Sequence, residues 1–146
     1  MEPKFQVQLR IGKPAAEVFD AVVKPDRLSA YFIQTASGPL VAGATVKWKF
    51  AEVPDPFDVV VEEVVAPERI VFGWPAASGG YNTKVEMVFK PIDASNTLVQ
   101  IAESGWRPDP AGIKQSYGNA GGWMHMMCCL KAYLEYGINL RTGGVC

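Results

Sequence analysis

The chain has 146 residues, of which 49% are hydrophobic and 20% charged, a composition that allows a substantial core and argues against disorder. The formal net charge is −1 and basic residues are interleaved with acidic ones, which argues against nucleic acid or an anionic membrane as the main partner. No apolar run approaches the ~20 residues of a membrane-spanning helix. With no repeat or linker, we expect one domain over residues 1–146.

The N-terminus and the cysteines predict a cytoplasmic protein. Residues 1–7 (MEPKFQV) alternate like a strand and lack the apolar block of a signal peptide. Cys128, Cys129 and Cys146 form an odd set with an adjacent pair, which is no disulfide framework and fits a reducing compartment.

The first third of the chain predicts one strand and two short helices. Residues 5–11 (FQVQLRI) alternate apolar and polar side chains, as a half-buried strand does. A helix follows over residues 14–23, because Pro14 suits the first position of a helix. Pro25 ends it and opens a second short helix over residues 25–32.

Most of the middle of the chain is predicted to be strand. Val, Ile, Phe, Trp and Thr are frequent there, and Gly, Pro, Asn and Asp bound each segment. The expected strands are 45–50, 57–66, 69–74, 81–91 and 97–106, with a shorter one near 33–36. Short connections between them favour an antiparallel meander.

The alternation within these strands predicts which side chains face inward. The expected inward set is Val46, Trp48, Phe50, Ile70, Phe72, Trp74, Val85, Met87, Phe89, Val99, Ile101 and Glu103. Residues 57–66 are too uniform in Val and Glu to assign in this way.

The last third predicts a long helix with one apolar stripe, from about residue 122 to 139. The stripe consists of Trp123, Met126, Met127, Leu130, Tyr133, Leu134 and Gly137. Because a helical glycine costs about 1 kcal/mol relative to alanine, Gly118, Gly121 and Gly122 predict an irregular or broken lead-in before this helix. Asp109 is a candidate cap for a helical turn that starts at Pro110.

Three segments resemble a known family. Residues 11–19 (IGKPAAEVF) resemble the opening of the START/Bet v 1-like (SRPBCC) superfamily, a strand followed by P-x-x-x-V-[FW]. Residues 65–74 (VAPERIVFGW) resemble the P-x-R-[LI]-x-[FY]-x-W segment of its Hsp90-ATPase-activator-homologue branch. Residues 97–106 (TLVQIAESGW) followed by 121–123 (GGW) resemble the closing strand and helix start of that branch.

The resemblance spans nearly the whole chain and agrees with the order of the predicted elements. It implies an α+β helix-grip fold, in which a curved antiparallel sheet wraps around a long C-terminal helix. Two short helices would lie between strands 1 and 2. Many relatives have an interior cavity, but fold alone constrains function poorly.

A cavity between sheet and helix would be lined by large inward side chains. The candidate ligand-binding residues are Trp48, Phe50, Phe72, Trp74, Tyr81, Met87, Ile101, Glu103, Trp106, Trp123 and Met127. The alternative is that these side chains fill a solid core. Tyr81, with Asn82 and Tyr117, would supply polar contacts at the mouth of such a pocket.

Glu103 is the sharpest polar candidate, because it stands where the alternation requires an inward apolar residue. In apolar surroundings it would orient a ligand or transfer a proton. Alternatively, it reaches solvent near the strand end or pairs with Arg107.

His125, Cys128 and Cys129 are not predicted to form a metal or catalytic site. His125 is the only histidine, and on a helical projection it lies on the polar side near Ala132. The two cysteines have no base or cation beside them in sequence and are interpreted as packing residues. We expect no catalytic residue, metal or cofactor.

Three functions remain open from the sequence. The leading hypothesis is binding of a small hydrophobic or amphipathic molecule between sheet and C-terminal helix. The second is an enzyme of cyclase or hydrolase type that uses Glu103 as acid or base. The third is a chaperone-associated or other protein-binding module, with a homodimer through apolar residues at a strand edge as one form.

Overall fold

The structure, a computed structural model, describes residues 2–145. In chain order its elements are β1 (Phe5–Ile11), α1 (Ala15–Val23), α2 (Pro25–Leu28), β2 (Thr35–Ala36), β3 (Thr45–Lys49), β4 (Phe57–Val65), β5 (Arg69–Pro75), β6 (Asn82–Asp93), β7 (Asn96–Ser104) and α3 (Pro110–Tyr136). The predicted strands and short helices are all present, with ends that differ by a few residues.

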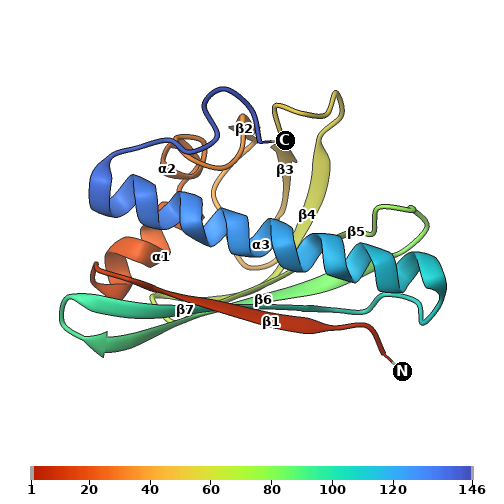
Figure 1. The fold of residues 1–146 in the computed structure, drawn as a ribbon, viewed down its shortest axis with the longest axis horizontal. Coiled ribbons are helices and arrows are strands. Elements are labelled where there is room, and N and C mark those ends of the chain that lie inside the picture. The colour runs from red at the N-terminus through yellow and green to blue at the C-terminus, as the bar shows by residue number, and fades with distance from the viewer. Residues whose placement is uncertain (1, 146) are drawn as a thin grey trace.

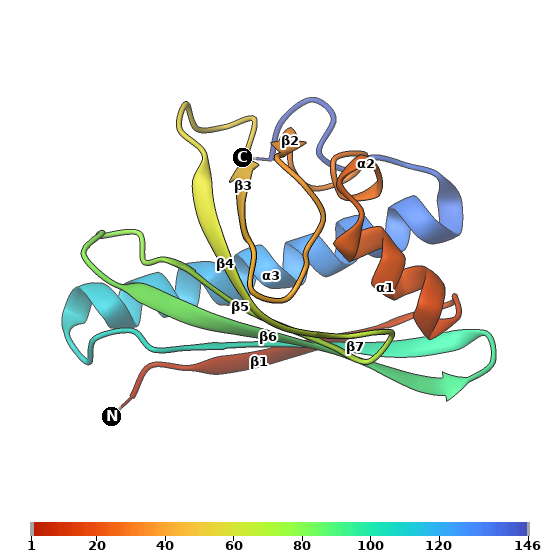
Figure 2. The same ribbon diagram turned by 180° about the vertical axis from the view of Figure 1, so that it is seen from behind.

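The strands form one antiparallel sheet in the order β1-β7-β6-β5-β4-β3-β2. The sheet is curved, and α3 runs the length of its concave face (Figure 1). Seen from behind, α1 and α2 lie on the same side of the sheet as α3, near one end of the helix (Figure 2). This is the predicted α+β helix-grip fold.

The predicted inward faces of the strands are confirmed. Alternation of buried and more exposed residues runs through β3, β6 and β7, as expected when one face of a sheet packs on a core. In β4 the register shifts between Val61 and Glu63. Such a bulge interrupts the period of two, which explains why the alternation of residues 57–66 gave no assignment.

The prediction of a broken lead-in to the C-terminal helix is wrong. Helix α3 is continuous for 27 residues and includes Gly118, Gly121 and Gly122. These three glycines are exposed, so each costs only its intrinsic propensity. Burial of the apolar stripe further along the same helix outweighs that cost.

Both ends of α3 have specific caps. At the N-terminus the carboxylate of Asp109 accepts a hydrogen bond from the backbone N–H of Gly112 at 2.8 Å. Gly112 is packed so closely that a Cβ there would lie 2.0 Å from the carbonyl oxygen of Arg107. At the C-terminus Gly137 adopts the left-handed conformation (φ 67°), which ends the helix earlier than the predicted residue 139.

We expect Gly118→Ala to raise the free energy of unfolding by about 1 kcal/mol, because the added Cβ meets no atom within 4 Å and alanine loses less entropy in a helix. Urea denaturation measures the change. Gly112→Ala in the same helix is the opposite control and should destabilise the protein. A loss of stability in Gly118→Ala would contradict this account.

No helix in the described part of the chain is both long and apolar enough to cross a membrane.

Candidate functional site

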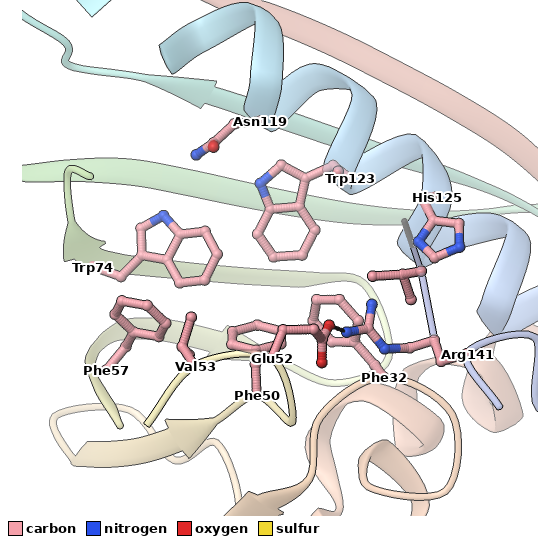
Figure 3. Close-up of a pocket in the computed structure, with 12 residues that line it drawn as sticks. Phe32, Phe50, Glu52, Val53, Phe57, Trp74, Asn119, Trp123, His125 and Arg141 are labelled. Carbon is pink, nitrogen blue, oxygen red and sulfur yellow. Dashed lines mark hydrogen bonds and ion pairs between the residues drawn. The ribbon is translucent and has the colours of Figure 1, made fainter. Parts of the chain in front are cut away.

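An apolar cleft of about 440 Å³ lies between α3 and the β3–β5 part of the sheet. Four groups of residues surround it: the β3–β4 loop with adjoining residues of β4 and β5, the connection after α2, one flank of α3, and the segment that follows α3 (Figure 3). The lining residues are Phe32, Phe50, Glu52, Val53, Phe57, Trp74, Asn119, Gly122, Trp123, His125, Arg141 and Val145.

Five aromatic side chains supply most of the wall. Phe50, Phe57 and Trp74 come from the sheet side, Trp123 from α3, and Phe32 from the connection after α2. Phe32 and Trp123 are buried, whereas the other three are partly exposed. The cleft wall is therefore mainly aromatic, and three of its five aromatic side chains are partly exposed.

Charged groups stand at one end of the cleft. Arg141 forms an ion pair with Glu52, which joins the segment after α3 to the β3–β4 loop (Figure 3). The Arg141 side chain is only 14% exposed. This burial lowers the pKa of its guanidinium below the usual value. His125 also faces this region, from α3.

Glu103 lies in the sheet beneath the cleft and is 1% exposed. Its carboxylate accepts hydrogen bonds from the indole N–H groups of Trp74 (3.0 Å) and Trp123 (2.8 Å). It also accepts from the hydroxyl of Thr83 at 2.6 Å and the amide of Asn119 at 3.1 and 3.2 Å. An ionised carboxylate is acceptor-only, and here four donors meet it.

The Glu103 network positions the two tryptophans of the cleft wall. Glu103 lies near the end of β7, where it pairs with Phe5 of β1 and Val85 of β6. Both indole N–H groups donate to the same carboxylate, which fixes the orientation of the two rings in the cleft wall. Glu103 itself does not line the cleft. The alternative pairing with Arg107 is absent, because Arg107 instead lies over the Tyr81 ring, 4.4 Å from its centroid.

The structure separates the residues predicted to line a pocket into four groups. Three of them, Phe50, Trp74 and Trp123, do line the cleft. Five are fully buried core residues outside it: Trp48, Phe72, Met87, Ile101 and Met127. Glu103 supports the cleft wall from below. Tyr81 and Trp106 lie elsewhere: Tyr81 accepts a hydrogen bond from the Arg107 backbone, and Trp106 packs on Phe5.

The sequence did not indicate the rest of the lining. Asn119 precedes Trp123 by four residues, so the helical period would have found it had α3 been predicted to continue through its glycines. His125 was expected on the polar side of the helix, near Ala132, and in no metal or catalytic site. His125 lines the cleft because the segment after Gly137 folds back along the side of α3 that carries it, so that Arg141 and Val145 line the same cleft.

The cysteine of α3 that faces the interior is a packing residue, as the sequence suggested. Cys129 is buried, and burial raises the pKa of its thiol to about 11. Its sulfur lies 3.6 Å from Nε2 of His125. Within residues 2–145, no group of three or more His, Cys, Asp or Glu side chains is placed to hold a metal ion.

A curved antiparallel sheet that grips a long C-terminal helix defines the helix-grip class of proteins. The sequence pattern of one family in that class matches residues 13–135. The chain therefore belongs to the family described as Activator of Hsp90 ATPase homolog 1-like protein.

Solved structures agree with this assignment. The protein SSP2350 from Staphylococcus saprophyticus is 26% identical, with a TM-score of 0.80 over 94% of this chain and 96% of its own. DynU16, a protein in the dynemicin biosynthetic locus, is 26% identical, with a TM-score of 0.81 over 94% of this chain. This chain spans 49% of DynU16. The Aha1 dimer from Colwellia psychrerythraea shares the fold at 18% identity, with a TM-score of 0.75 over 92% of this chain and 97% of its own. No curated protein matches the sequence.

Proposed function

We propose that this protein binds a small hydrophobic or amphipathic molecule in the cleft between the sheet and α3. The observation that carries the proposal is the wall of five aromatic side chains around about 440 Å³. Ligand pockets typically have volumes of about 300–1,000 Å³ and apolar linings with a few placed polar groups. Here Asn119, His125 and the Glu52–Arg141 pair are those polar groups.

The Glu103 network supports binding more than catalysis. A general acid or base must reach the group with which it exchanges a proton. Both carboxylate oxygens of Glu103 already accept hydrogen bonds from protein donors, and none of its atoms lines the cleft. The hypothesis of a cyclase or hydrolase that uses Glu103 therefore has less support than a binding protein in which Glu103 is a positioning residue.

Assembly, domain count and compartment stay predictions. A homodimer is compatible with the family, since a solved structural neighbour is an Aha1 dimer. A chaperone partner would follow only from the name of the family. One domain over the whole chain and a cytoplasmic location are inferred from the sequence alone.

Mass spectrometry under native and then denaturing conditions tests the proposal directly. A co-purified molecule of defined mass that is lost on denaturation would support binding and begin to identify the ligand class. Titration with an apolar fluorescent probe complements it, since Trp74 and Trp123 line the cleft and report occupancy through their own emission.

A pair of adjacent helical glycines offers a matched test of where the ligand binds. Gly122 lines the cleft and Gly121 does not, although both are exposed and a Cβ on either meets nothing within 4 Å. We expect Gly122→Leu to lower probe affinity at least about tenfold by filling the cleft, while Gly121→Leu leaves it within about twofold. Equal affinities in the two variants would place binding elsewhere.

A further inference from the structure

The aromatic side chains of the cleft form a closed ring of neighbours. Successive ring centroids are separated by 5.1 Å (Phe32–Phe50), 5.8 Å (Phe50–Phe57), 6.2 Å (Phe57–Trp74), 5.2 Å (Trp74–Trp123) and 5.8 Å (Trp123–Phe32). The face of an aromatic ring is the negative pole of its quadrupole. Aromatic faces are a setting in which organic cations are bound.

The chain already places one cation of its own against this ring. The guanidinium carbon of Arg141 lies 5.6 Å from the centroid of Phe32 and 5.9 Å from that of Phe50. Both distances are within the range of a cation–π interaction. The carboxylate of Glu52 pairs with the same guanidinium. Arg141 thus occupies a cation position made of two aromatic faces and one carboxylate.

The charges around the cleft favour a positive ligand once Arg141 is moved aside. Glu52 stands at the mouth, and the Glu103 carboxylate lies directly behind the two indoles that donate their N–H groups to it. A carboxylate that accepts a hydrogen bond from an indole N–H adds negative potential at the faces of that indole. Among residues 2–145, Arg141 and the imidazole of His125 are the only basic side chains in the lining.

Arg141 sits on a segment that is tied down by few contacts. It follows the end of α3 at Gly137, and its neighbour Asn139 donates a hydrogen bond to the carbonyl of Ala30 at 3.0 Å. Most of residues 137–145 are exposed. Moving Arg141 therefore disrupts little of the core.

We propose that the ligand of the cleft carries an organic cation, an alkylammonium or guanidinium group on an apolar body. This cation would replace Arg141 in its contacts with Phe32, Phe50 and Glu52. This inference rests on the proposed binding function and specifies its ligand class. Arg141 is then an internal competitor that occupies the cation position of the free protein.

Three probes with the same octyl chain test the charge preference: octyltrimethylammonium, 1-octanol and octanoate, each below its micelle-forming concentration. Isothermal calorimetry and tryptophan emission measure their affinities. We expect the cation to bind about tenfold more tightly than the alcohol, and octanoate to bind most weakly. Octanoate binding as tightly as the cation would overturn the inference and make Arg141 the counter-ion of the ligand. Binding of none of the three would overturn the proposed function itself.

Variants of the charged pair separate the two roles of Arg141. We expect Arg141→Gln to raise the affinity for octyltrimethylammonium several-fold, about fivefold, because the internal competitor is gone. In the double variant Arg141→Gln/Glu52→Gln, the affinity for octyltrimethylammonium should fall again by a similar factor, while the affinity for 1-octanol stays within about twofold. An affinity for the cation that falls in Arg141→Gln would contradict the competitor role.

Two controls match these substitutions outside the cleft. Arg27 also lies over an aromatic ring, 5.5 Å from the centroid of Tyr133, and does not line the cleft. Asp58 also pairs with a basic side chain, Lys47, on the surface of β3 and β4. Arg27→Gln and Asp58→Asn should leave all three affinities unchanged. A change in the cation affinity equal to that of the cleft variants would show a general electrostatic effect and overturn the assignment.

Discussion

Glu103→Gln is expected to lower the free energy of unfolding by about 2–4 kcal/mol. Glutamine keeps the shape of the side chain but replaces one acceptor oxygen with a donor NH₂ group. The hydroxyl of Thr83 can rotate and the amide of Asn119 can flip to meet that group, but an indole can only donate. One indole N–H, of Trp74 or Trp123, is therefore left facing a donor, at a cost of about 1–3 kcal/mol in addition to the lost charge-assisted bonds.

Urea denaturation measures the stability change, and near-ultraviolet circular dichroism shows whether the two tryptophans keep their packing. Glu86→Gln is the matched control, since Glu86 lies on neighbouring β6 but pairs with Arg69 at the surface. A half-exposed pair of this kind contributes less than about 1 kcal/mol. If Glu103→Gln were as stable as the control, the carboxylate would not be a positioning residue, and a role as acid or base would regain support.

The sheet could be predicted in detail because its signal is local. When one face packs on the core, most residues at every second position of β3, β6 and β7 are apolar. The same rule identified Glu103 as an inward residue, since it follows Val99 and Ile101 at every second position of the strand. Neither observation requires knowledge of residues distant in sequence.

The continuous helix could not be predicted from propensity. Three glycines within five residues indicate a break when each is weighed alone. The side chain of Asp109 and the close packing of Gly112 start α3 at Pro110, and burial at Ser116 and Trp123 continues it past those glycines. The cap at Asp109 is local and was predicted, but the burial of Ser116 and Trp123 is tertiary, so a local rule does not contain it.

The cleft was only partly foreseeable, for a related reason. The positions of Trp74 and Trp123 could be predicted from the strand and helix periods. Phe57, by contrast, begins a strand whose period is interrupted by a bulge, and Glu52 lies in the loop before that strand, where no period applies. Arg141 lies beyond the end of α3, where no period applies. The charged end of the cleft is made by segments that meet only in the folded chain.

Met127→Ala is expected to lower the free energy of unfolding by about 2–5 kcal/mol while leaving probe affinity nearly unchanged. Met127 is 0% exposed and lies in the core cluster rather than in the lining of the cleft. Truncation of such a side chain removes its transfer free energy and leaves a cavity that the surroundings fill only in part. An inward-facing methionine on α3 was a natural candidate for ligand contact. Met127 instead belongs to the core cluster that also contains Trp123.

Met124 provides the comparison on the same helix, because it is only partly buried against the core. We expect Met124→Ala to cost about 1 kcal/mol or less, in proportion to the smaller apolar area that it buries. Urea denaturation and a probe titration on each variant separate stability from binding. If Met127→Ala changed the affinity at least about tenfold at nearly wild-type stability, the occupied space would extend beneath Trp123 into the core. An unchanged probe affinity, as expected here, would instead confine binding to the space between the aromatic side chains of the cleft and the segment that carries Arg141.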